Sequence, residues 1–306
     1  LAAMVSQMLE NRDAGERFRH DLCYFSLELY LKFILATLSG HLLYQLRSEP
    51  ETLVEIEKQL YADMQKPSLG HWLSSFRRLI KIQAKHLNEP GLIDLANTFI
   101  LKKNKKNLDS VNQLRKMLEP FGISSAEVKY WKEFPSFLTH YRNQILGHGS
   151  CLVTEAEYAP LTEKLTEILI YFLSQLEEKS QNWLLIQDVG KDHGRNQRIF
   201  QIWLKDKVQD SCFHRVNETL TQNHLYLVER QQIEDPENKQ CREQYNVLAD
   251  YSAWLYMQSE KIPESLCIFN GEAGTGKNNL EYLCYHTGLR YKEYSIVALR
   301  LHQKIK

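Results

Sequence analysis

The sequence lacks an excess of charge of either sign. Its 306 residues include 38 Lys and Arg residues and 38 Asp and Glu residues, so the formal net charge is zero. A protein that binds duplex DNA tightly and constitutively usually carries a clear basic excess. Any contact with nucleic acid is therefore expected to be local or transient, as in an enzyme that contacts one or two phosphates.

The sequence also lacks paired cysteines. Its six cysteines are scattered and none belongs to a Cys-x-x-Cys pair, which excludes the common spacings of zinc sites and disulfide scaffolds. The histidines of the second half show no metal-ligand spacing either, so we predict no metal and no cofactor. We expect reduced thiols, which are typical of a cytoplasmic protein.

No apolar run reaches the ~18 residues of a membrane span. The N-terminus lacks the basic and apolar regions of a signal peptide, so we expect a cytoplasmic protein without membrane contact. The chain begins Leu1-Ala2-Ala3-Met4, which suggests a fragment of a longer protein. Its length, with 43% hydrophobic and 25% charged residues, suits two domains of ordinary composition.

Residues 1–180 show the apolar spacing of successive helices, which predicts a mainly α protein that begins with a helical bundle. The first helix is expected to run to about residue 47, with a kink or short break at Gly40. Its apolar stripe consists of Phe18, Leu22, Phe25, Leu29 and Phe33. Further helices are expected at 51–65, 69–87, 91–103, 109–119, 125–146 and 155–179. For the basic cluster 102–106 we expect a solvated loop, with RNA contact as the alternative.

Residues 181–306 change to short β-favouring runs separated by turn-rich stretches. Strands are expected at 183–186, 198–204, 225–228, 265–269 and 281–285, with one helix between them near 241–257. This pattern predicts a small α+β or mostly-β module, which we expect to be cut short.

The segment Gly271–Lys277 matches the G-x-x-x-x-G-K pattern of a phosphate-binding loop. That mechanism needs a helix after the loop and a Ser or Thr after the lysine to bind Mg²⁺. Asn278 follows instead, and the next residues alternate like a strand. We favour a β-hairpin with a glycine-rich loop, and a nucleotide-binding signalling protein that uses Lys277 remains the alternative.

The segment Tyr141–Gly149 combines an arginine, an amide and a histidine near a predicted helix end, where Gly147 is expected to stop the helix. Arg142 offers a planar fork of donors that matches phosphate oxygens. His148 has a side chain that can transfer protons near neutral pH, and Asn143 can orient the histidine or the phosphate. In the alternative interpretation, Arg142 and His148 are structural, with an ordinary salt bridge and a histidine at a helix end.

The spacing Arg142-Asn143-x(4)-His148-Gly149 resembles the Arg-Asn-x(4)-His signature of the HEPN superfamily, an all-helical domain found in many bacterial toxin and defence ribonucleases. The resemblance covers residues 1–180. It implies a helical bundle in which two protomers join their motifs across a two-fold axis and cut RNA without a metal. The implied catalytic residues are Arg142, Asn143 and His148. His140 and Tyr141 are weaker candidates for substrate binding. For His140 a surface or interface position is favoured, and for Tyr141, whose ring could stack on a base, a core or dimer contact is favoured.

The leading hypothesis is thus a metal-independent endoribonuclease, a toxin or antiviral defence effector, that is active as a homodimer. Residues 181–306 would then sense a signal, which is either a regulatory protein or a small molecule. The alternative is a non-catalytic helical dimerisation or scaffold protein with a β-rich sensor.

Overall fold

The computed structural model describes two sets of residues. In the helical part these are 15–64, 68–103, 105, 107–123, 126–147 and 153–179. In the strand-rich part they are 182–192, 197–204, 207–211, 215–216, 220, 225–234, 241–251, 255–258, 265–272, 280–284 and 290–293.

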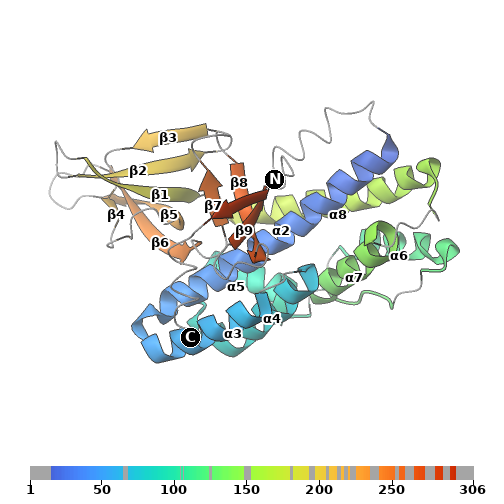
Figure 1. The fold of residues 1–306 in the computed structure, drawn as a ribbon, viewed down its shortest axis with the longest axis horizontal. Coiled ribbons are helices and arrows are strands. Elements are labelled where there is room, and N and C mark those ends of the chain that lie inside the picture. The colour runs from blue at the N-terminus through green and yellow to red at the C-terminus, as the bar shows by residue number, and fades with distance from the viewer. Residues whose placement is uncertain are drawn as a thin grey trace. The chain divides into compact units, whose positions relative to one another are not determined.

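The first part of the chain is helical, as predicted (Figure 1). Its α-helices are α2 (Glu16–Gln45), α3 (Pro50–Met64), α4 (Leu69–Gln83), α5 (Pro90–Ala96), α6 (Asp109–Met117), α7 (Phe134–Tyr141) and α8 (Glu155–Lys179). Shorter 3-10 turns are η1 (Leu46–Ser48), η2 (Ala84–His86), η4 (Glu119–Phe121) and η5 (Trp131–Glu133), and π-helical segments are η3 (Asn97–Leu101) and η6 (Arg142–Gly147). The helices expected at 51–65, 69–87, 91–103, 109–119 and 155–179 are confirmed.

The helix expected at 125–146 begins later than predicted. Residues 126–130 are not helical, and α7 starts at Phe134 after the turn η5. The Asn112 side chain explains the difference, because its Oδ1 accepts a hydrogen bond from the Val128 N–H at 3.1 Å and its Nδ2 donates to the Val128 carbonyl at 3.0 Å. These bonds take the place of helical ones.

Helix α2 continues through Gly40, so the short break given as one of the two expectations there is wrong. A Cβ atom at Gly40 would lie 2.7 Å from the carbonyl oxygen of Asp250. The glycine therefore serves a close approach of two backbones, which is a common use of this residue.

The apolar stripe predicted for α2 is its less buried side. Phe18 and Phe25 are 51% and 38% exposed, whereas Tyr24, Leu27 and Tyr30 are fully buried. The helix is apolar around most of its circumference, so spacing alone did not identify the inner face.

By length and composition, the helical stretch Glu16–Ser48 is apolar enough to cross a membrane. Of its most apolar window, 83% is buried inside the structure, and core helices of soluble proteins pass the same test. The expectation of no membrane contact stays a prediction.

The second part of the chain is rich in strands, and the change comes between Lys179 and Trp183, where the sequence placed it. The strands are β1 (Trp183–Asp192), β2 (Gln197–Leu204), β3 (Lys207–Ser211), β4 (Arg215–Val216), β5 (Leu225–Glu234), β6 (Cys241–Asp250), β7 (Leu255–Gln258), β8 (Ser265–Glu272), β9 (Leu280–Cys284) and β10 (Arg290–Glu293). They form sheets of order β3-β2-β1-β5-β6-β4 and β10-β9-β8-β7 (Figure 1). Neighbouring strands are antiparallel, apart from the parallel pair β4 and β6.

The helix expected near 241–257 is wrong, because this segment contains β6 and β7. Strand β6 pairs with β5 along its whole length, from Cys241 opposite Glu234 to Asp250 opposite Tyr226. Tyr245 and Val247 point to one side at strand spacing and join a buried cluster. Its other members are Tyr44, Ile186, Leu220, Tyr226 and Val228.

Contacts divide the chain into two compact units that each combine several segments. One unit comprises Leu1–Leu35, Pro67–Ala84 and Pro90–Lys179, and the other comprises Ala36–Lys66, Lys85–Glu89 and Ser180–Lys306. The C-terminal part of α2 thus belongs with the sheet. Within that unit, the Thr37 hydroxyl lies 2.6 Å from the Tyr251 hydroxyl, and His41 Nδ1 lies 2.5 Å from the Leu248 carbonyl oxygen.

We predict that Gly40→Ala destabilises the protein by about 1–3 kcal/mol, because the added methyl group overlaps the Asp250 carbonyl. Chemical denaturation measures the change. Gly70→Ala in α4 is the matched control, since a Cβ atom there would meet its nearest neighbour, Ser68 Oγ, at an ordinary 3.6 Å. The control is expected to be neutral or stabilising. Equal effects of the two substitutions would contradict the steric explanation.

Candidate functional site

The Arg142 motif lies where α7 passes directly into the π-helical segment η6. The inner face of α7 is apolar, and Phe134, Leu138 and Tyr141 on it are fully buried. Phe134 packs against Phe172 of α8 with ring centroids 5.2 Å apart. This packing fixes the helix, so that the residues after Tyr141 start from a defined position. Single π-helical turns inside helices frequently occur at functional sites.

The core behind α7 is aromatic, and Phe172 is its centre. Four rings lie 4.9–5.2 Å from that of Phe172, three of them edge-on and one stacked, which are arrangements that favour aromatic pairs. They belong to Tyr30, Phe99, Trp131 and Phe134. Helices α2, α7 and α8 and the turns η3 and η5 are thereby held around one cluster.

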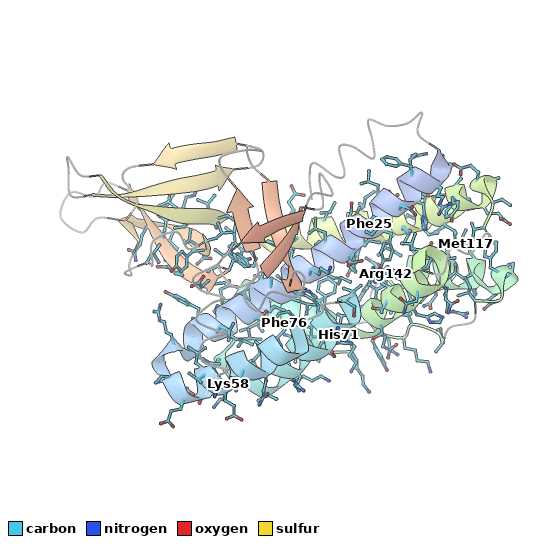
Figure 2. All side chains as sticks on the ribbon, viewed as in Figure 1. Phe25, Lys58, His71, Phe76, Met117 and Arg142 are labelled. Atoms are coloured by element: carbon cyan, nitrogen blue, oxygen red, sulfur yellow. The ribbon has the colours of Figure 1, made fainter. Side chains whose placement is uncertain are left out.

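Arg142 forms a long ion pair with Glu28 of α2, and Figure 2 labels its position. Its Nε lies 4.0 Å from Glu28 Oε2, and the side chain is 41% exposed against 6% for Glu28. Glu28 Oε1 also lies 2.8 Å from Nζ of Lys32, which is 5% exposed. One carboxylate thus lies near two cations, and Arg142 is the more exposed of the two.

Tyr141 is a core residue, in agreement with the favoured interpretation, and its burial argues against the weaker candidate role of stacking on a substrate base. It is fully buried, and its ring is stacked on that of Tyr24 with centroids 6.1 Å apart. Its hydroxyl lies 2.5 Å from Nε2 of the buried His20, whose Nδ1 lies 2.9 Å from Asp21 Oδ1. With an ionised Asp21 as acceptor, His20 donates from Nδ1, and its Nε2 accepts from the Tyr141 hydroxyl. This chain of hydrogen bonds anchors the residue next to Arg142.

His140 and Asn143 lie on the outer side of the same helical stretch. Asn143 is exposed and His140 is half-buried. His140 Nε2 is buried without a hydrogen-bond partner among the described residues. The ring lines an open pocket of about 360 Å³ together with Val128, Glu133 and Ser136. His140 is thus positioned beside a hollow, and its role in substrate binding stays a prediction.

His148 lies outside the described residues, as does Gly149. The structure therefore brings together Arg142 and Asn143 of the predicted trio, with His148 following directly after the last residue of η6. The sequence interpretation missed Glu28, Lys32, His20 and Asp21. A signal for the first two was present, since Glu28 and Lys32 are four residues apart in the mostly apolar middle of the helix.

The segment Gly271–Lys277 connects two antiparallel strands. Gly271 and Glu272 belong to β8 and pair with Glu281 and Leu280 of β9. Residues 273–279 lie outside the described residues. A phosphate-binding loop requires a helix where β9 lies. The two strands of the expected hairpin are therefore confirmed. The helix that the nucleotide-binding alternative requires after the loop is replaced by β9.

Among the described residues, no group of three or more His, Cys, Asp or Glu side chains is arranged to hold a metal ion. No protein-family model, curated protein or solved structure matches this chain. The resemblance to the HEPN superfamily thus depends on the motif and on the helical part that carries it.

Two buried groups near the motif can lose a proton at high pH, the Cys23 thiol and the Tyr141 hydroxyl. Burial raises the pKa of the Cys23 thiol to about 12, against a smaller lowering by the hydrogen bond to Thr166. Burial also raises the pKa of Tyr141 well above its usual value. Both groups keep their protons in the folded state at a pH where the unfolded chain has lost them.

We predict that the contribution of these two groups to the free energy of unfolding is constant below about pH 9. It falls as the pH rises to about 12. The unfolded state binds fewer protons in this range, so stability decreases by up to about 1.4 kcal/mol per pH unit for each group. Urea denaturation between about pH 8 and about pH 11 measures it. Cys23→Ala should flatten the first part of this decline, because cysteine ionises before tyrosine. An unchanged slope in that variant would contradict the assignment to Cys23.

Proposed function

We propose that the protein is a HEPN-type, metal-independent endoribonuclease that cleaves single-stranded RNA as a homodimer. In this proposal it acts as a toxin or antiviral defence effector, and residues 181–306 sense a regulatory protein or a small-molecule signal. The observation that carries the proposal is the geometry at Arg142. The partly exposed guanidinium of Arg142 comes directly after the buried Tyr141 and forms an ion pair with Glu28. The exposed Asn143 is the next residue of the Arg-Asn-x(4)-His sequence.

The proposed reaction is attack of the ribose 2′-oxygen on the adjacent phosphorus. His148 accepts the 2′-hydroxyl proton, the bond from phosphorus to the 5′-oxygen breaks, and the 5′-oxygen takes a proton from a histidine acting as an acid. The products are a 2′,3′-cyclic phosphate and a 5′-hydroxyl. In the homodimer, the two copies of His148 can supply the base and the acid.

Arg142 stabilises the negative charge that develops on the non-bridging oxygens in the transition state. Its planar fork of donors suits two phosphate oxygens at once. Asn143, exposed on the same turn, holds the phosphate or orients His148. A fixed cation and a proton-transfer group are sufficient for this chemistry, so the proposal needs no metal.

Glu28 positions Arg142 in the proposed site. Its closer contact is to Lys32, at 2.8 Å against 4.0 Å for Arg142, so the carboxylate only partly neutralises Arg142. Because Glu28 is nearly buried on α2, it holds the guanidinium without competing for the exposed side that faces substrate.

We predict that the purified protein cleaves single-stranded RNA in EDTA and leaves 2′,3′-cyclic phosphate ends. Arg142→Ala and His148→Ala should each lower the cleavage rate by a factor of about 10²–10⁴, because each removes transition-state stabilisation or proton transfer. Cleavage of a labelled RNA, with analysis of the product ends, measures the effect.

Arg115→Ala is the matched control for these variants. Arg115 lies on α6 in an i,i+4 ion pair with Glu119, 2.9 Å away, and its loss should leave cleavage unchanged. Undiminished cleavage by Arg142→Ala or His148→Ala would reject the catalytic assignment. If the wild-type protein turns over no RNA under any activating condition, the scaffold interpretation is the one that survives.

We predict that Glu28→Gln destabilises the fold by about 3 kcal/mol, because it leaves Lys32 buried without its carboxylate. The double variant Glu28→Gln with Lys32→Met removes both charges and should recover most of this stability. Its cleavage rate should still be about tenfold lower, because Arg142 lacks the group that positions it. Denaturation and cleavage assays on the same samples separate the two effects. Wild-type activity of the double variant would show that Glu28 has no positioning role.

A further inference from the structure

A basic pocket lies between α4 and η5, away from the motif. Arg77, Arg78 and Lys81 come from α4 and Lys132 from η5, and Glu133 is the acidic residue in the lining of this space of about 630 Å³. Four cations thus face one carboxylate in a chain whose formal net charge is zero. This local excess is the type of feature that attracts phosphate groups.

The pocket is held by well-packed elements. Trp72 and Phe76 on the inner face of α4 are fully buried, and Figure 2 labels Phe76. Arg77 donates from Nη2 to the Lys132 carbonyl and from Nη1 to the Ser136 hydroxyl, at 3.4 Å in the second case. These bonds connect α4, η5 and α7 and fix one cation, while Arg78 and Lys81 remain exposed.

An aromatic ring adjoins the pocket and is surrounded by cations. The ammonium groups of Lys103, Lys105 and Lys132 lie 5.5, 5.4 and 5.9 Å from the centroid of the Tyr130 ring. Lys132 also lines the pocket, so the ring and the pocket form one surface. The combination of a basic groove with an aromatic ring is typical of proteins that bind single-stranded nucleic acid.

The outer side of α7 connects this surface to Arg142. Ser136 lines the basic pocket and also the hollow beside His140. Ser136, His140 and Asn143 follow one another at steps of four and three residues, so they lie on one helix face. The distance along the helix axis from Ser136 to Asn143 is about 10 Å, which a short stretch of RNA can span.

We infer that Arg77, Arg78, Lys81 and Lys132, together with Tyr130, bind the backbone of single-stranded RNA at nucleotides that flank the scissile phosphate. This inference rests on the proposed function. The cations contact phosphates and the tyrosine stacks on a base, so binding depends on salt and tolerates different sequences. The surface gives affinity for the strand, and Arg142 and His148 perform the chemistry.

The test measures binding separately from cleavage. In the full chain carrying His148→Ala, Arg78→Ala with Lys81→Ala should weaken binding of a fluorescent single-stranded RNA about tenfold. The slope of affinity against salt, between about 50 and about 200 mM, should become shallower by about one to two units. Both side chains are exposed on α4, so the fold is retained. Tyr130→Ala should also weaken binding, whereas Tyr130→Phe, which keeps the ring, should not.

Lys58→Ala with Lys116→Ala is the charge-matched control, since both lysines are exposed, on α3 and α6. It should bind RNA like the parent. In the active protein, Arg78→Ala with Lys81→Ala should raise KM about tenfold and leave kcat within about threefold.

Each outcome decides between the hypotheses. Unchanged binding by the α4 double variant would overturn this surface even if the wild-type protein cleaves RNA. Binding that depends on the surface without any cleavage by the wild type would support the surface and reject the nuclease. If Lys58→Ala with Lys116→Ala weakens RNA binding equally, the effect is one of overall charge and the surface is overturned. If a duplex RNA binds as tightly as a single strand, the assignment to single strands is overturned.

Discussion

The position of the motif depends on the burial of Tyr141. Its hydroxyl is bonded to His20, and its ring is enclosed by Tyr24 and the other aromatic side chains between α2 and α7. A buried hydroxyl that lost its partner would carry a large desolvation cost, so the bond to His20 selects one placement of the helix. Arg142 is the next residue, and the turn after it changes to π-helical geometry. Local sequence thus presents the guanidinium at the surface, but contacts more than a hundred residues away decide where.

The helical part that carries the motif contains both a buried ion pair and exposed cations. Glu28 and Lys32 form an ion pair inside the helical core, and the partly exposed Arg142 lies 4.0 Å from the second carboxylate oxygen of Glu28. On α4 and η5, cations gather without an equal number of carboxylates. A chain with zero net charge can therefore carry local positive potential, which is sufficient for a ligand that contacts few phosphates. The prediction from overall composition, that the protein is no constitutive duplex binder, stays a prediction, and composition carried no information about this local arrangement.

Elements with clear apolar spacing between turn-rich stretches were predictable from the sequence. Elements that distant contacts fix were not. Apolar spacing marked most helices correctly, and the short β-favouring runs marked β1, β2, β5, β8 and β9. The segment 241–257 was misread because its strand β6 is specified by pairing with β5. The start of α7 depended on a side chain of α6, Asn112, that bonds to Val128. At the candidate site, Arg142 and Asn143 were found by spacing. The pairing of Arg142 with Glu28 and of Tyr141 with His20 joins residues more than a hundred positions apart, so spacing could not predict it.

The Glu28–Lys32 pair is difficult to explain by stability alone. A buried ion pair often contributes less to folding than apolar residues of similar volume, because both charges lose their hydration. The second carboxylate oxygen of Glu28, however, lies 4.0 Å from Nε of Arg142. A lone carboxylate at this depth would be costly, and a lone arginine at the helix end would lack a fixed orientation. Lys32 offsets the burial of Glu28, and in the proposed site Glu28 then orients Arg142 from 4.0 Å away. An ion pair of Arg142 with a carboxylate is also what the structural interpretation of this residue predicts, so the distinction between the two interpretations depends on the exposed part of the side chain, which is 41% accessible.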